Sequence, residues 1–153
     1  MLVKAQDLIT RTSRVDRLFV VTAIAFNLLI SAIFIAQNHQ IVTLVRVFGT
    51  IWLLLSIPFA IVFLQYWKAG REPWIRIYLG ITFIYMFVEL VLDYVLKIEF
   101  RQMPAIHIPY IILEYLALFG LIGIAFAINR KWGVVVSLSF GILMISLAYL
   151  YII

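Results

Sequence analysis

The sequence predicts an all-α integral membrane protein, a bundle of five transmembrane helices in a single domain. Of its 153 residues, 66% are hydrophobic and 12% are charged, whereas soluble domains carry roughly 25% charged residues. A soluble protein of this length could not bury so many apolar side chains in one core. Five apolar stretches follow one another, each near the roughly 20 residues that cross a hydrocarbon layer of about 30 Å. Most of the surface is therefore expected to face lipid.

The boundaries of the spans follow from these stretches and from the residues between them. The expected spans cover residues 18–36, 47–65, 74–96, 108–128 and 132–153. The last two are separated only by residues 129–131, and charges there fit a tight helical hairpin better than the middle of one helix. Pro58 is expected to kink the second span. Pro73 and Pro109 are expected in the first turns of the third and fourth spans.

The basic residues predict the orientation. If the N-terminus is cytoplasmic, nine of the twelve basic residues lie on the cytoplasmic side. These nine are Lys4, Arg11, Arg14, Arg17, Lys68, Arg71, Arg76, Arg130 and Lys131. The outer side keeps only Arg46, Lys97 and Arg101. The positive-inside rule then places the N-terminus in the cytoplasm and the C-terminus outside the cell membrane.

Residues 1–16 form an expected cytoplasmic amphipathic segment ahead of the first span. Lys4, Asp7, Arg11 and Arg14 recur there at helical spacing. A short helix with one charged face binds at the surface of an anionic leaflet. We therefore expect a short interfacial helix at the N-terminus.

Small residues recur every four positions on the last two spans. Gly133, Ser137 and Gly141 do so on the fifth span, and Gly123 with Ala127 on the fourth. Such stripes let helix backbones approach closely in lipid. They predict packing between these two helices, with a homo-oligomer interface as the alternative.

The candidate functional site lies on the third and fourth spans. Tyr85, Glu89, Asp93 and Lys97 are spaced by four, so they share one face of a helix. Glu89 lies roughly 12 Å below Lys97 at about 1.5 Å per residue. The fourth span enters from the same side, which places Glu114 at a similar depth. This shared depth in the outer half of the membrane points to one polar cavity.

Carboxylates within a membrane span are unusual because their charge is costly there. A carboxylate at the centre of a span costs about 2.5–3.5 kcal/mol on insertion scales. Asp93 is expected to pair with Lys97, one turn away. Glu89 and Glu114 have no basic residue at equal depth within the spans, so they are expected to hold or share a proton. The remaining candidate ligand- or proton-binding residues are Tyr85, Tyr110 and Asn27.

A purely structural role for the acids is the alternative to a cavity. Hydrogen bonds between membrane helices are worth about 0.6 kcal/mol on average. That gain is small beside the cost of inserting two glutamates, so a functional cavity is favoured.

Several chemistries are excluded by composition. Cysteine is absent, which removes disulfides and thiolate chemistry. His39 and His107 lie in different polar segments, and no Gly-rich phosphate loop occurs. The sequence therefore predicts neither a metal site nor a cofactor. The net charge of +5 is explained by topology, so no nucleic-acid partner is expected.

Three functions remain open. The favoured one is binding or transport of a cation, a proton or an amphipathic small molecule, because no nucleophile or metal set accompanies the carboxylates. The second is a lipid-modifying enzyme that acts on an isoprenoid or sterol-type substrate through intramembrane acids. The third is an accessory subunit of a membrane complex. The expected partners are accordingly the bilayer, a small-molecule, lipid or cation ligand, and either a partner subunit or a second copy of the chain.

Overall fold

The computed structural model describes residues 2–152, and the side chains of residues 14–152. Over this range the chain is helical and contains no strand. Five helical segments are long and apolar enough to cross a membrane: Arg14–Asn38, Val42–Lys68, Pro73–Val95, Pro104–Ile128 and Arg130–Ile152. The predicted fold class and the number of spans are thereby confirmed at the level of helix length and composition.

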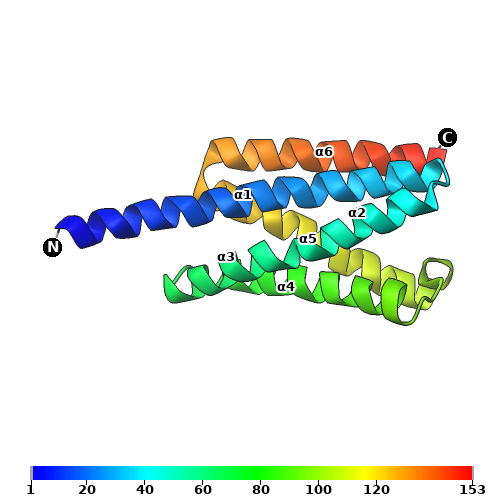
Figure 1. Ribbon diagram of the computed structural model, residues 1–153, viewed down its shortest axis with the longest axis horizontal. Coiled ribbons are helices and arrows are strands. Elements are labelled where there is room, and N and C mark those ends of the chain that lie inside the picture. Colours follow the sequence, from blue (N-terminus) through cyan, green and yellow to red (C-terminus); the bar gives the residue numbers. More distant parts are fainter. Residues whose placement is uncertain (1, 153) are drawn as a thin grey trace.

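The spans form a closed ring. The elements in chain order are α1 (Leu2–Asn38), α2 (Val42–Leu54), α3 (Ser56–Lys68), α4 (Pro73–Glu89), η1 (Leu90–Val95), η2 (Phe100–Gln102), α5 (Pro104–Ile128) and α6 (Arg130–Ile152). Each span packs against the spans before and after it in the chain, and α6 closes the ring against α1 (Figure 1). This arrangement leaves an interior to which all five spans contribute.

Apolar side chains cover the outside of the ring. Every span exposes large hydrophobic residues, among them Val21, Leu64, Phe87, Phe119 and Ile145. The interior is equally apolar over much of its length and is filled by aromatic rings of α1 and α3. A helical bundle that is apolar on both sides suits lipid, because its helices satisfy their own backbone hydrogen bonds.

The second span is broken where the proline predicts it. Pro58 has no N–H group, so the carbonyl of Leu54 loses the donor that an unbroken helix would supply. α2 ends at Leu54, and the N–H of Leu55 donates to the carbonyl of Trp52 at 3.0 Å. The break separates α2, which packs against α1, from α3, which also reaches α4.

The third span ends in a π-helical turn. After Glu89 the helix is of the π type, in which each backbone hydrogen bond spans five residues instead of four. The N–H of Leu96, for example, donates to the carbonyl of Val91 at 2.8 Å. Lys97 then adopts a positive φ of 51°, which reverses the chain direction. The spacing of four that was expected to continue to Lys97 therefore stops at Glu89.

Prolines and a hinge define the last two spans. α5 begins at Pro104 rather than near residue 108, so Pro109 lies inside the helix and its predicted first-turn place is wrong. Pro73 does occupy the first turn of α4. Asn129 is extended, and its side chain accepts a hydrogen bond from the N–H of Lys131 at 2.9 Å. The predicted hairpin is confirmed.

The small-residue stripes do not form one interface. A Cβ at Gly133 would meet the ring of Phe126, so α6 approaches α5 closely at that point. Gly123 faces a tryptophan of α4 instead, Ala127 is exposed, and Gly141 has open space around it. The expectation that both stripes join α5 to α6 is therefore wrong except at Gly133. Helix α6 also packs along α1.

The N-terminal segment is continuous with the first span. α1 runs without a break from Leu2 to Asn38, and its first turns extend beyond the bundle (Figure 1). Side chains of residues 1–13 lie outside those described, so an amphipathic helix lying on the membrane surface stays a prediction.

Candidate functional site

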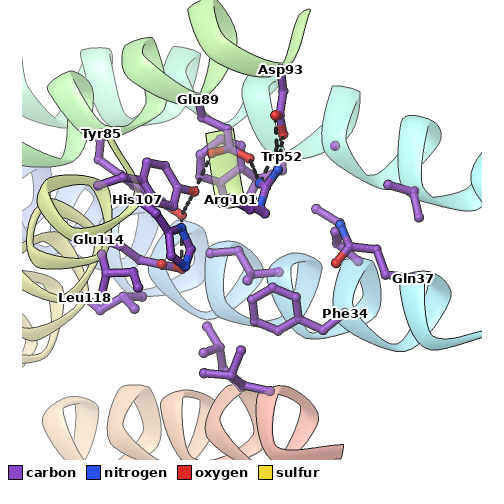
Figure 2. A pocket seen from close by; sticks show the side chains of 18 of the residues that line it. Phe34, Gln37, Trp52, Tyr85, Glu89, Asp93, Arg101, His107, Glu114 and Leu118 are labelled. Atoms are coloured by element: carbon purple, nitrogen blue, oxygen red, sulfur yellow. Dashed lines mark hydrogen bonds and ion pairs between the residues drawn. The ribbon is translucent and has the colours of Figure 1, made fainter. Parts of the chain in front are cut away.

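A cavity of about 190 Å³ lies inside the ring, at the end of the bundle that carries the α1–α2 connection and the η1–η2 loop. We call this the Arg101 end. All five spans contribute to the wall. Glu89, Arg101 and Glu114 line one part of the wall, and Phe34 lines it from α1 (Figure 2). The cavity is therefore amphipathic, with charge gathered on one wall.

Arg101 is the cation of this wall. Its Nη2 lies 2.9 Å from Glu89 Oε1, and its Nη1 lies 3.1 Å from Asp93 Oδ1. The predicted pairing of Asp93 with Lys97 is wrong, because the ion-pair partner of Asp93 is Arg101. Glu89 was expected to have no basic residue at equal depth within the spans, and its cation comes instead from η2, between two spans.

The turn after the third span brings Arg101 to these acids. The π-helical turn and the positive φ of Lys97 fold the chain back, and Phe100 is fully buried at the start of η2. The guanidinium of Arg101 lies over the Phe100 ring, 4.5 Å from its centroid. Burial opposes the charge of Arg101, but Glu89 and Asp93 outweigh that effect and raise its pKa. The guanidinium stays charged.

Two tyrosines connect Glu89 to Glu114. The hydroxyl of Tyr110 donates to Glu89 Oε2, and it lies 3.3 Å from the hydroxyl of Tyr85. The hydroxyl of Tyr85 lies 3.2 Å from Glu114 Oε1. The structure thus brings Tyr85, Glu89, Asp93, Tyr110 and Glu114 together in one network, and the two glutamates meet through tyrosines rather than directly.

Glu114 differs from the other two acids in its partners. Glu89 and Asp93 share Arg101, whereas Glu114 has no ion-pair partner among the side chains of residues 14–152. Its one side-chain hydrogen bond in that range is with Tyr85. It lines the cavity together with apolar residues.

Aromatic rings hold the network in place. Tyr85 packs edge-on against Trp52, with ring centroids 5.5 Å apart, and lies 5.6 Å from Tyr110. Both rings also line the cavity. Trp52 Nε1 and His107 Nδ1 are buried at this wall without a hydrogen-bond partner in the structure. Asn27 Oδ1 and Arg76 Nε, which do not line the cavity, are also buried without a partner.

Asn27 does not join the network. Its Nδ2 donates to Ser139 Oγ on α6 at 2.8 Å, and Asn27 does not line the cavity. The expectation that it completes the carboxylate network is wrong, because equal depth says nothing about which way a side chain points around its helix. The bond instead ties α1 to α6.

Three residues of the site were missed or undervalued by the sequence. Arg101 was expected among solvated charges, and His107 as a loop residue, yet both line the cavity. Trp52 carried a usable signal, because the other three tryptophans, Trp67, Trp74 and Trp132, lie at the ends of spans. A tryptophan deep within a span is unusual for a residue that prefers the membrane interface.

A second polar cluster lies at the opposite end of the bundle, which we call the Arg71 end. Tyr66 donates to Asp16 Oδ1 at 2.7 Å, and Arg71 Nη2 lies 3.0 Å from both oxygens of the same carboxylate. The guanidinium of Arg71 lies 5.2 Å from the centre of the Tyr66 ring. The cluster ties the α3–α4 connection to α1, and none of its three residues lines the cavity.

Within the described part of the chain, no three His, Cys, Asp or Glu side chains are placed to hold a metal ion together. Comparison of the chain with protein-family models, with curated proteins and with solved structures found no match. Function is therefore argued from the cavity itself.

Proposed function

We propose that this chain is a small multi-pass protein of the cell membrane whose cavity binds, and is built to transport, a small amphipathic cation. The observation that carries the proposal is the count of charges at the cavity. Three carboxylates line it, and Arg101 forms ion pairs with two of them, Glu89 and Asp93. Glu114 is left as the group that a cation would satisfy.

The shape of the cavity supports an amphipathic ligand over a bare ion. Ile30, Phe34, Leu118 and Leu143 line the same cavity of about 190 Å³ as the acids. Small-molecule sites combine such an apolar lining with a few polar groups that fix orientation. A ligand with a compact apolar body and one ammonium group would fill both halves.

Glu114 is the group that we assign to the ammonium. A carboxylate in a low-dielectric site is costly without a counter-charge, and a bound cation removes that cost. Tyr85 already holds one oxygen of Glu114 at 3.2 Å, which would orient the carboxylate toward the cavity.

The orientation that we propose places the N-terminus in the cytoplasm. The Arg101 end then faces the outside, so ligand would enter from there. Because the chain has no cysteine, single cysteines can report the topology without background. A cysteine at Lys97 should react with a membrane-impermeant maleimide added outside intact cells, whereas one at Lys68 should not. The reverse pattern would invert the proposed orientation.

Calorimetry on protein in lipid nanodiscs tests the binding, with protein-free nanodiscs to subtract partitioning into lipid. The probe is phenethylammonium, and its neutral counterpart is 2-phenylethanol. We expect the ammonium to bind more tightly, and Glu114→Gln to weaken its binding at least tenfold. Glu99→Gln is the matched control, because Glu99 is an exposed acid of the same end that does not line the cavity. Equal binding of both probes, or no loss in Glu114→Gln, would overturn the proposal.

A further inference from the structure

The four groups Glu114, Tyr85, Tyr110 and Glu89 form an unbranched chain of three oxygen–oxygen links. The links measure 3.2 Å from Glu114 to Tyr85 and 3.3 Å from Tyr85 to Tyr110, and Tyr110 bonds directly to Glu89. Tyr85 is 2% exposed and Tyr110 is 7% exposed. Their hydroxyls therefore satisfy one another and the two acids rather than bulk water.

Counting protons along this chain shows that one is missing if both acids are ionised. Each tyrosine hydroxyl supplies one proton, and an ionised carboxylate supplies none. Two protons then serve three links, so Tyr85 donates to Glu114, Tyr110 donates to Glu89, and the two hydroxyl oxygens face each other without a proton between them. One further proton on a carboxyl group gives every link its own hydrogen bond.

Arg101 favours the proton on Glu114 over Glu89, because of these two acids it forms an ion pair only with Glu89. It lies 2.9 Å from Glu89 Oε1 and favours the ionised form of Glu89. Glu114 has no such partner among the described side chains. With the proton on Glu114, the chain runs in one direction: Glu114 donates to Tyr85, Tyr85 to Tyr110, and Tyr110 to Glu89.

Other titratable groups share the cavity with Glu114. Beyond the chain itself, the titratable or charged residues that line the cavity are Asp93, Tyr94, Arg101, His107, Tyr115 and Tyr151. Of these, Asp93 is paired with Arg101, and Tyr115 lies against Met144 Sδ at 4.0 Å. The lining residues from α1 and α2 bring no charge.

From this geometry we propose that Glu114 exchanges one proton for each cation bound, and that the two tyrosines carry the proton between Glu114 and the rim. The inference rests on the proposed binding of a cation. As the cation approaches, the Glu114 proton passes to Tyr85, the Tyr85 proton to Tyr110, and the Tyr110 proton to Glu89. Glu89 releases it to water at the rim, where the side chains of Asp93 and Arg101 are 28% and 42% exposed. When the cation leaves, Glu89 takes up a proton from water, and the reverse transfers through Tyr110 and Tyr85 return a proton to Glu114.

Infrared spectroscopy tests the protonated acid without any ligand. Wild-type protein should show the carbonyl band of a protonated carboxyl group near neutral pH. The band should be lost in Glu114→Gln and kept in Asp93→Asn, the matched control. Absence of the band in the wild type would overturn the inference, as would a band that survives Glu114→Gln.

Calorimetry of phenethylammonium binding then tests the exchange in the wild-type protein, so the test does not depend on a variant that folds. Measured in buffers of different ionisation enthalpy, binding should release close to one proton. Affinity should rise about tenfold per pH unit while Glu114 is protonated, as linkage requires. Binding without proton release would overturn the exchange and leave the proposed function standing. No binding of the cation would overturn both.

The rate of proton release tests whether the proton passes through Tyr85 and Tyr110. In stopped-flow measurements with a pH indicator, Tyr110→Phe should slow proton release several-fold after mixing with phenethylammonium. Tyr149→Phe is the matched control, because Tyr149 lies against His39 at the same end of the bundle and does not line the cavity. Equal release rates in the wild type and in Tyr110→Phe would overturn the path.

Discussion

The two ends of the bundle use the same residue types for different purposes. Each has an arginine, at least one acid and a tyrosine that bonds to a carboxylate. The side chains of Asp16 and Glu89 are also almost equally buried, at 16% and 15% exposure. Burial therefore does not separate the two clusters.

Charge count and cavity do separate them. At the Arg71 end one acid meets one arginine, and the cluster packs without lining the cavity. At the Arg101 end three acids meet one arginine beside about 190 Å³. A balanced cluster holds helices together, whereas an unbalanced one beside a cavity has a charge left for a ligand.

Removal of Arg101 should have the largest effect on stability. Arg101→Met leaves Glu89 and Asp93 close together without their cation, whereas Arg71→Met leaves a single acid that still accepts from Tyr66. Hydrogen bonds to charged groups are worth about 1.5–3 kcal/mol. We expect Arg101→Met to lower the free energy of unfolding in detergent by about 2–3 kcal/mol, and Arg71→Met by about 1 kcal/mol.

A charge-removing partner substitution controls this comparison. Adding Asp93→Asn to Arg101→Met removes one of the two uncompensated acids and should restore about half of the loss. If the double variant is no more stable than Arg101→Met alone, the arginine stabilises the turn by packing on Phe100 and not by its charge.

The acids of the two ends should behave in opposite ways. Asp16→Asn weakens its hydrogen bonds with Tyr66 and Arg71 and should lower the free energy of unfolding by about 1.5 kcal/mol, with cation binding unchanged. Glu114→Gln should abolish cation binding with stability equal to or above that of the wild type, because functional sites carry groups that do not favour stability. Unfolding in detergent and calorimetry on the same preparations check both. Weakened binding in Asp16→Asn would contradict the division between the ends.

Much of the fold could be predicted because it depends on composition and length. Apolar runs of span length and the charged hinge at residues 129–131 were sufficient to place five helices. The break before Pro58 followed from its missing N–H. These features are local, so short segments of the sequence are sufficient to predict them.

The site was predicted only where helical spacing held. Tyr85 and Glu89 are four apart within α4, and they do line one cavity. Beyond Glu89 the π-helical turn changes the register, so Asp93 meets Arg101 in place of Lys97. The return of η2 toward the bundle is not a local pattern, because it buries Phe100 in the core formed by the spans.

Alanine substitutions at two glycines test the packing at the two ends, and their expected effects on stability are smaller. A Cβ at Gly120 would meet the ring of Tyr78, and overpacking costs about 1–3 kcal/mol. Alanine's better helix propensity returns about 0.8–1 kcal/mol, so Gly120→Ala should lose about 1 kcal/mol of stability without a change in binding. A Cβ at Gly49 would meet the hydroxyl of Tyr94, which lines the cavity.

Gly49→Ala should therefore change phenethylammonium affinity several-fold, because the end of a flexible side chain moves aside with little loss of stability. Gly80→Ala is the control for helix propensity, since nothing lies within 4 Å of the added Cβ. It should leave affinity as it is. Equal affinities in Gly49→Ala and Gly80→Ala would show that Tyr94 does not shape the binding site.

The smallest expected effect belongs to Lys97, and it separates the two ways of pairing Asp93. If the straight helix of the sequence-based prediction were present, Lys97→Met would remove the partner of Asp93 and resemble Arg101→Met. In the structure Lys97 is exposed at a positive φ, and Asp93 is held by Arg101. Substitution of an exposed residue without such a contact changes stability by less than about 0.5 kcal/mol. Unfolding of both variants under one detergent condition decides between the two pairings. With the π-helical turn, Arg101 forms the ion pair with Asp93, so only its substitution should lower stability.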